Sequence, residues 1–327
     1  MVSALAGVAA VTYVTAALAE NLFQTGVSLT VWSGLIMGAC AALLLLGDYR
    51  WLDWCMKLVL LVLVLATTTA FLLALVNGPV AVSPYASPSP WNLASLGFLL
   101  ALMGWMPAPL EISVYQSLWV VARNDLRKES MSLGEARADF NFGYFTSTVL
   151  ALMFLALGAL VMHGTGQVIS GNAAEFAAQL VRIYQTALGG WSGPIIAAAA
   201  FTAMFSTTLT VIDANPRALA TAIDIVLPKP VLPVRKLRWW ILVAGCGLEL
   251  VIISCFVSSL SDLVDLATIL AFLAGPVFAM LNFRLITSRH TPEEVRPGMV
   301  MRVWSMVGIS FFLLTGVLYV VYRFLLS

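Results

Sequence analysis

Charged residues are scarce in this sequence, since Asp, Glu, Lys and Arg make up only 10% of its 327 residues. An average soluble domain has about 25%. Hydrophobic residues make up 61%, and the mean hydropathy is +0.96. A soluble fold cannot bury that much apolar surface, and a disordered chain needs the opposite composition. The composition therefore excludes a cytosolic enzyme, a secreted domain and a disordered protein, and it predicts an all-α polytopic membrane protein.

The residues of common catalytic and metal sites are also few. There are two histidines, His163 and His290, and four cysteines without a Cys-x-x-Cys pair. The cysteines lie in or beside apolar runs, which is typical of small membrane-embedded side chains rather than of disulfides or metal sites. No phosphate loop or nucleophile–base set is recognisable. We therefore expect no enzymatic activity, no bound cofactor and no nucleic-acid partner; the expected partner is the lipid bilayer.

Long apolar runs of the length of a membrane span are what the sequence does contain. Trp and Tyr mark several of their ends, as in the aromatic belts of membrane proteins. One loop, 164–192, includes apolar residues at helical spacing over 173–188, which predicts a short helix on the outer surface. Together the runs predict a single transmembrane domain over 1–327 with nine spans, at about 4–24, 29–47, 56–77, 95–122, 144–163, 194–213, 239–260, 264–284 and 303–326.

The basic residues give these spans an orientation. When the connecting segments are assigned to alternate sides, 15 of the 17 Lys and Arg residues fall on one side, and only Arg182 and Arg323 fall on the other. The basic side is cytoplasmic by the positive-inside rule. The predicted topology therefore places the N-terminus inside and the C-terminus outside, and the bacterial cytoplasmic (inner) membrane is the expected location.

The fourth predicted span contains its own interruption. Gly104-Trp105-Met106-Pro107-Ala108-Pro109 lies in its middle, and the two prolines remove two backbone donors and clash with preceding carbonyls. The helix should therefore break at 104–109. One interpretation is a proline kink packed by its neighbours. The other is a substrate or ion site, since broken helices hold the substrate in secondary transporters and Glu111 follows within a turn.

Transporters of this type break one helix in each of two inverted repeats. Only the fourth span is broken here, and three spans precede it, although a five-helix repeat requires five. We therefore expect that two helices are missing before the first residue.

Other polar residues in or near the spans each leave two interpretations open. Glu20 is either hydrated at the outer interface or part of a proton or ion path. Asp213 and Arg217 are four residues apart on a helix; either they pair across one turn near the cytoplasmic mouth and serve as a gate, or they only cap the helix. Asp265 either stabilises the start of its helix or faces a cavity. Glu249 lies deep in the seventh predicted span.

Three segments resemble one family. Leu102-Met103-Gly104-Trp105-Met106-Pro107 resembles the Met-Pro-His motif in the sixth helix of NRAMP divalent-metal transporters. Ala17-Leu18-Ala19-Glu20 is similar to that family's Asp-Leu-Ala-Glu, and the run around Ser206-Thr207-Thr208 is similar to its Gly-Gln-Ser-Ser-Thr stretch. The resemblance covers the whole chain, as helices three to eleven of an eleven-helix protein.

The resemblance implies a leucine-transporter-type inverted-repeat fold, N-terminally incomplete, and proton-coupled uptake of manganese, iron or similar divalent ions. It implies that Met106 offers a thioether to the metal, that Met103 offers a backbone carbonyl beside Gly104, and that Glu20 lies on the proton path. Glu111, Asp213, Arg217 and Asp265 remain candidates for a proton path or gate.

Several positions depart from the family pattern. Ala108 stands where the motif has His, Ala17 where it has Asp, and Phe205 where it has Gln. The first-helix Asp-Pro-Gly-Asn has no counterpart. Two alternatives to divalent-metal transport therefore stay open: a degenerate, non-transporting membrane protein, and a transporter of another ion such as magnesium. The oligomeric state does not follow from the sequence.

Overall fold

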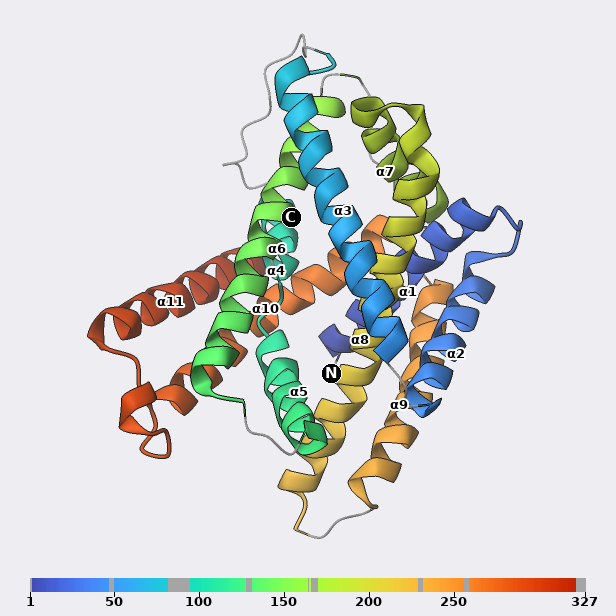
Figure 1. Ribbon diagram of the computed structural model, residues 1–327. Helices are drawn as coiled ribbons and strands as arrows, with labels where there is room; N and C mark the ends of the chain where they lie inside the picture. The colour runs from blue at the N-terminus through green and yellow to red at the C-terminus, as the bar shows by residue number, and fades with distance from the viewer. Residues whose placement is uncertain are drawn as a thin grey trace.

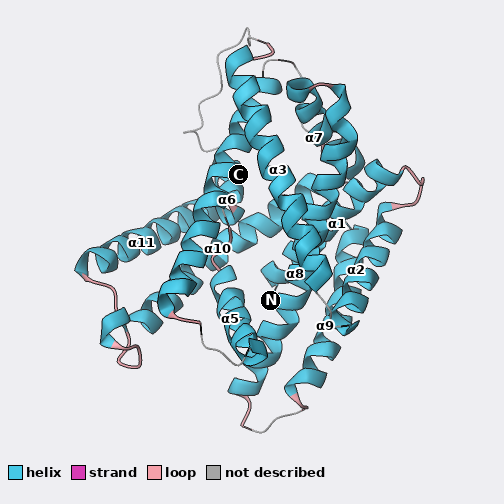
Figure 2. Cartoon of the chain, viewed as in Figure 1, coloured by secondary structure: helices cyan, strands magenta, loops and turns pink. Residues whose placement is uncertain are grey.

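The computed structural model describes residues 2–46, 50–81, 95–106, 108–127, 131–163, 165, 170–228, 232–255 and 259–321, and within these ranges it is helical without a strand (Figures 1 and 2). In chain order the helices are α1 (Val2–Phe23), α2 (Leu29–Leu46), α3 (Arg50–Asn77), α4 (Leu96–Trp105), α5 (Ile112–Arg127), α6 (Leu133–Val161), α7 (Ala173–Leu188), α8 (Gly193–Val226), α9 (Val234–Cys255), α10 (Leu260–Thr287) and α11 (Met299–Val321). Two short 3-10 turns, Gly190–Ser192 and Glu293–Val295, precede α8 and α11.

Seven helical segments in the described ranges are long and apolar enough to cross a bilayer. A shorter apolar helix, Leu29–Leu45, and the interrupted α4–α5 pair make up the rest of the apolar chain. Many large apolar side chains on these helices are exposed. A bilayer can cover such surfaces where water cannot. The fold is therefore that of an all-α polytopic membrane protein, and the count of nine spans stays a prediction.

The helix α1 occupies the centre of the bundle. It packs against α2, α7, α8, α9 and α10. In its most apolar stretch 67% of the residues are buried, whereas 11% are buried in the corresponding stretches of α6 and α11. Many of its buried side chains are small, including Ala9, Ala16 and Ala19 at 0% exposure. Small residues allow backbones to approach closely, which is how helices associate where lipid surrounds them. The central helix α1 thus contacts five other helices of the bundle.

Local sequence signals set the ends of several helices. Ser132 and Glu135 form a capping box at the start of α6, so this helix begins eleven residues before the apolar run at 144–163. Asn172 caps α7 by accepting hydrogen bonds from the backbone of Ala174 and Glu175. Polar caps and charged first turns extend helices beyond their apolar spans, and hydropathy alone does not reveal these extensions.

The helix α7 packs into the bundle rather than resting only on its surface. Tyr184 is 1% exposed, and its hydroxyl shares a 2.8 Å hydrogen bond with Thr67 Oγ1 on α3. Burial raises the pKa of Tyr184 to about 12, so this contact is between neutral groups at physiological pH. Figure 1 shows α7 at the upper end of the molecule, whereas the C-terminal end of α8 and the start of α9 lie at the lower end.

Candidate functional site

The break in the fourth apolar run separates α4 from α5. Helix α4 ends at Trp105, Met106 is extended at φ −110° and ψ 119°, and α5 begins at Ile112. The N–H of Met106 donates to Leu102 O at 3.0 Å, which is the last helical bond of α4. Pro107 itself lies outside the described residues. Because proline has no N–H, the carbonyl of Met103 receives no donor four residues along the chain.

Three contacts attach the broken segment to α10. An ideal Cβ on Gly104 would lie 2.1 Å from the carbonyl oxygen of Thr268, so α4 and α10 approach to a distance that only glycine permits. Leu110 Cδ1 lies against Gly275, and Asn282 Nδ2 donates to Ser113 Oγ at 2.9 Å. The contacts fall on both sides of the break. The two half-helices are therefore held at fixed positions against one continuous partner.

The donors at this break are few. Met103 and Met106 are both half-buried, and Gly104 is buried. Within the described part of the chain, no three His, Cys, Asp or Glu side chains gather closely enough to hold a metal ion. The groups that the break itself can offer a cation are therefore the thioether of Met106 and the backbone carbonyls.

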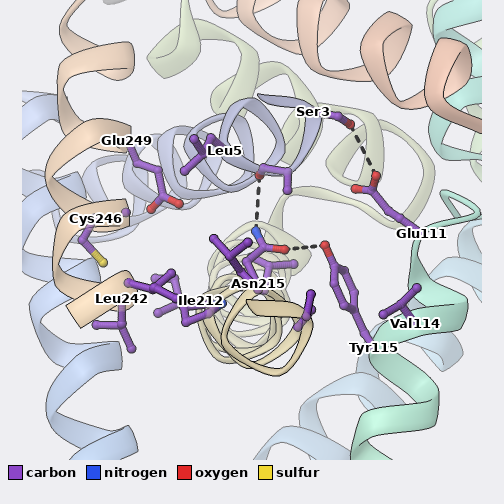
Figure 3. A pocket seen from close by; sticks show the side chains of 18 of the residues that line it. Ser3, Leu5, Glu111, Val114, Tyr115, Ile212, Asn215, Leu242, Cys246 and Glu249 are labelled. Atoms are coloured by element: carbon purple, nitrogen blue, oxygen red, sulfur yellow. Dashed lines mark hydrogen bonds between the residues drawn. The ribbon is translucent and has the colours of Figure 1, made fainter. Parts of the chain in front are cut away.

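A cavity of about 330 Å³ opens beside the second half of the break, between α1, α5, α8, α9 and α10 (Figure 3). Glu111 lies on its wall and accepts a long 3.4 Å hydrogen bond from Ser3 Oγ. Tyr115 donates its hydroxyl to Asn215 Oδ1, and Asn215 Nδ2 donates to the carbonyl of Ala4 at 3.4 Å. The cavity thus connects Glu111 with polar groups of α1 and α8 inside a mostly apolar lining.

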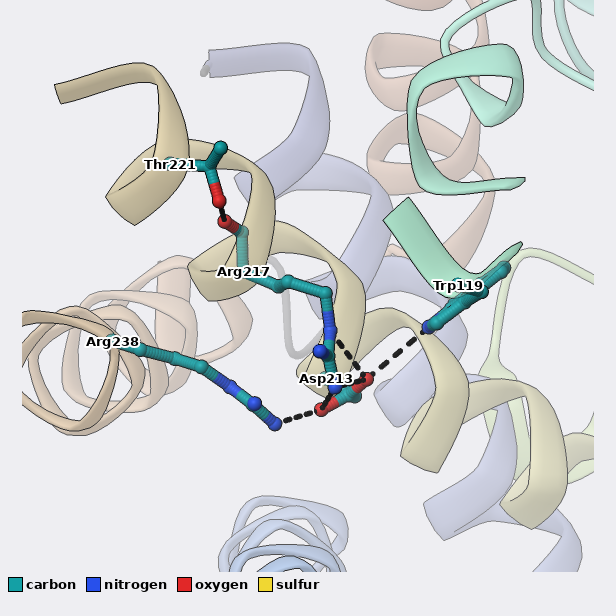
Figure 4. Close-up of polar contacts among 5 residues, drawn as sticks. All are labelled: Trp119, Asp213, Arg217, Thr221 and Arg238. Atoms are coloured by element: carbon teal, nitrogen blue, oxygen red, sulfur yellow. Dashed lines mark hydrogen bonds and ion pairs between the residues drawn. The ribbon is translucent and has the colours of Figure 1, made fainter. Parts of the chain in front are cut away.

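Asp213 is the centre of a charged cluster that joins three helices (Figure 4). It forms an ion pair with Arg217 at 3.0 Å one turn along α8, and a second ion pair with Arg238 of α9. The indole N–H of Trp119 on α5 donates to the same carboxylate at 3.2 Å. The Asp213 side chain is 13% exposed. One carboxylate therefore connects α5, α8 and α9.

Glu20 lies away from both the break and the cavity. Its carboxylate accepts hydrogen bonds from Thr25 Oγ1 at 2.6 Å, from the N–H of Gly26 at 2.7 Å and from Trp32 Nε1 at 2.7 Å. Phe23 stacks on the Trp32 ring at 5.7 Å between centroids. These bonds close the turn between α1 and α2. Glu20 therefore stabilises the turn between α1 and α2, and its place on a proton path stays a prediction.

Replacing Glu20 with glutamine should loosen this turn, because the amide nitrogen cannot accept the bonds that an oxygen of the carboxylate accepts. We expect a lower apparent melting temperature, with a smaller loss than at Gly104 or Asp213. Trp32→Phe should cause a similar loss, and the double variant should lose less than the sum, since both remove one bond. Thermal unfolding in detergent followed by tryptophan fluorescence measures this. Additive losses would contradict the assigned bond.

Two further residues that the sequence analysis singled out, Asp265 and Thr208, lie outside the cavity. Asp265 is exposed, one turn into α10, after Ser259 has capped the helix by accepting from the N–H of Asp262. Thr208 is buried, and its Oγ1 shares a 2.8 Å hydrogen bond with Thr15 on α1. Neither residue lines the cavity.

A model of the natural resistance-associated macrophage protein-like family, Nramp, matches residues 1–322. The chain belongs to the Nramp family. An uncharacterized protein of Pasteurella multocida (strain Pm70) is 40% identical over 281 residues, which are 85% of this chain and 64% of that protein. The Nramp chain therefore spans a little under two thirds of the length of that relative. The resemblance seen in the three sequence motifs is confirmed, and so is the polytopic Nramp-type fold.

Within this Nramp chain, several residues of the cavity and of the charged cluster carry no motif that marks them in the sequence. They are Tyr115, Trp119, Asn215, Arg238 and Glu249. The one sequence signal available was the polar or charged residue within an apolar helix, which applies to Asn215 and to Glu249. Tyr115 and Trp119 lie within α5, and Arg238 lies one turn into α9, so only the packing distinguishes them from other residues of these helices.

Proposed function

We propose that this Nramp-family protein is a secondary active transporter of divalent metal cations, and that the cation binds at the break between α4 and α5. The observation that carries the proposal is the break itself. The carbonyl of Met103 lacks a helical donor, Met106 is extended, and both half-helices are fixed against α10. Unwound carbonyls of this kind coordinate cations in secondary transporters. Transport leaves the ion chemically unchanged, so we assign no enzymatic activity.

The expected substrates are manganese and iron(II), which are softer than calcium and magnesium. A thioether is a soft ligand and prefers such transition metals, whereas carboxylates and carbonyls suit hard ions. Met106 is the soft side chain at the extended residue of the break, and Ala108 occupies the position of the family's histidine. We therefore expect the preference for manganese over magnesium to depend chiefly on Met106.

We propose that Glu111, rather than Glu20, is the acidic residue next to the bound ion on the transport path. Glu111 lies between the break and α5 and lines the cavity, whereas the oxygens of Glu20 already accept three bonds in a turn. If transport is coupled to protons, the protonation of Glu111 is the step that we expect to couple them. The cluster around Asp213 and Arg217 serves as the gate-forming contact in the C-terminal half of α8.

The uneven distribution of Lys and Arg supports an inner-membrane orientation with the N-terminus inside and the C-terminus outside. The cluster of Asp213, Arg217 and Arg238 then lies toward the cytoplasm, and α7 lies toward the outer side. This orientation places the cavity on the cytoplasmic side of the break.

Replacing Met106 with alanine should reduce manganese uptake about tenfold and weaken discrimination against magnesium, because a soft ligand is lost while the carbonyls remain. The complete gene product, reconstituted in liposomes, allows uptake of both ions to be measured with an internal fluorescent indicator. Met306→Ala is the matched control, since Met306 is 42% exposed on the peripheral helix α11. It should transport as the wild type does.

Two results would contradict the proposal. If the wild-type protein carries no divalent cation, the non-transporting alternative holds. If Met106→Ala is indistinguishable from wild type and magnesium is carried as well as manganese, the soft-ion assignment is wrong and a hard-ion transporter remains.

A further inference from the structure

The cavity shown in Figure 3 has an acidic and otherwise apolar lining that the proposed transport site does not use in full. Its wall opposite Glu111 is formed by α9, where Leu242, Gly245, Cys246 and Glu249 face inward. This wall lies across the cavity from the break. Ligand binding at the α9 wall does not require that the protein transports a metal ion.

Glu249 has the one carboxylate oxygen that is buried without a hydrogen-bond partner among the described residues. The residue is 4% exposed, and its Oε2 is buried without a hydrogen-bond partner. Figure 3 shows the carboxyl group directed into the cavity from α9. A buried charge without a partner is costly, so such a group takes up a proton or binds a cation. The absence of a side chain on Gly245, whose Cβ position is 3.9 Å from Glu249 Oε1, leaves room beside it.

The groups around the cavity favour a cation over an anion. Its ionisable lining residues are Glu111, Tyr115, Cys246 and Glu249. Among these described lining residues, two carry acidic groups and none is Lys, Arg or His. An anion in the cavity would therefore meet two carboxyl groups and no cationic side chain that could pair with it.

The apolar lining favours an organic cation over a bare metal ion. A hard divalent ion takes six or more oxygen ligands or keeps its water shell. Here the lining between the two carboxylates is mainly Val, Leu, Ile, Ala and Phe, with the Asn215–Tyr115 pair already bonded to each other. A volume of about 330 Å³ has room for roughly eleven waters. Ligand pockets of this size are typically apolar with few polar anchors.

We propose that this cavity binds an organic ammonium ion, with the ammonium group on the carboxylate of Glu249 and the aliphatic body against the walls formed by α5 and α8. The ammonium group reaches the carboxylate of Glu249 from the cavity that this residue lines, and the ion pair compensates the buried negative charge. The apolar walls bury the hydrocarbon part, as they would bury a lipid chain or an apolar side chain.

The test uses n-hexylammonium as the probe, with n-hexanol as its neutral counterpart. The complete protein is placed in phosphatidylcholine nanodiscs, whose lipid has no net charge, and binding is measured by isothermal titration calorimetry. We expect n-hexylammonium to bind with a dissociation constant below about 1 mM. Glu249→Gln should weaken that binding about ten- to a hundredfold and leave the weaker binding of n-hexanol unchanged.

A pair of glycines on α9 supplies a matched control for the location. Gly245 lines the cavity, whereas Gly247 is exposed on the same helix with no atom near its Cβ position. Gly245→Leu should fill the space beside Glu249 and abolish binding, and Gly247→Leu should bind n-hexylammonium as the wild type does. Because Glu249→Gln keeps the size of the side chain, it still tests the proposal if Gly245→Leu fails to fold.

The proposal is overturned if the wild type does not bind n-hexylammonium below about 1 mM. It is also overturned if n-hexanol binds equally well, or if Glu249→Gln binds the ammonium ion as tightly as the wild type. Loss of metal uptake in liposomes affects none of these measurements, so failure of the transport assignment is distinguished from failure of this one.

Discussion

Replacing Gly104 with alanine should destabilise the protein by about 3 kcal/mol, which lowers the ratio of folded to unfolded molecules on the order of a hundredfold. The added Cβ would lie 2.1 Å from the carbonyl oxygen of Thr268 and 2.9 Å from its carbonyl carbon. These are backbone atoms of α10, so they cannot move aside as a flexible side chain can. The helices α4 and α10 would have to separate, and the contacts on both sides of the break would weaken.

Thermal unfolding in detergent, followed by size-exclusion of the remaining soluble protein, measures this loss. Gly97→Ala is the matched control, because it lies on the same helix and its new Cβ would meet only Tyr319 Cε2 at an ordinary 3.8 Å. The control should melt as the wild type does. Equal melting temperatures for Gly104→Ala and Gly97→Ala would show that α4 and α10 are not packed as described.

The break was predictable from the sequence, but its packing was not. The residues of Gly104-Trp105-Met106-Pro107-Ala108-Pro109 predict an interruption through local chemistry, since the prolines remove donors within the same segment. In the structure α4 ends at Trp105 and α5 begins at Ile112. That Gly104 meets Thr268, more than 160 residues later, depends on how α10 crosses α4. One sequence contains no pattern that encodes such a crossing.

Among the charged residues, too, partners on the same helix were predictable from the sequence, whereas partners on other helices were not. The spacing of Asp213 and Arg217 predicts their pairing because both lie on one helical face. Arg238 and Trp119 reach the same carboxylate from other helices. For Glu20 the sequence left interface hydration and a proton path open, and its partner Trp32 was not anticipated. The bond to Trp32 closes a short turn, which depends on the conformation of the residues between α1 and α2.

That the protein is a membrane protein followed from its composition alone, whereas the cavity could not be predicted from the sequence. Apolar content and hydropathy predict that lipid is the solvent, because this is a property of the whole chain. A cavity arises where five helices leave a gap, and its lining comes from side chains far apart in sequence, such as Glu111 and Glu249. Glu249 was visible as a charge in an apolar run, but its unpartnered Oε2 is a consequence of packing.

Replacing Asp213 with asparagine should destabilise the junction of α5, α8 and α9 by about 2–4 kcal/mol. The substitution keeps the shape of the side chain and removes its charge. Arg217 and Arg238, which are 25% and 22% exposed, are then left as two cations facing each other without a counter-charge. The Nε of Arg238 is already buried without a partner, so this guanidinium depends on Asp213 for its compensation.

Thermal unfolding and the fluorescence of Trp119 measure the effect together, since the indole N–H donates to Asp213 Oδ2. Asp224→Asn is the matched control, because Asp224 is exposed further along the same helix. Arg238→Met should recover part of the loss when it is combined with Asp213→Asn, because it removes one of the two unpaired cations. If the double variant is as unstable as the sum of the single variants, then Asp213 and Arg238 are not coupled, and the cluster does not hold α9 against α8.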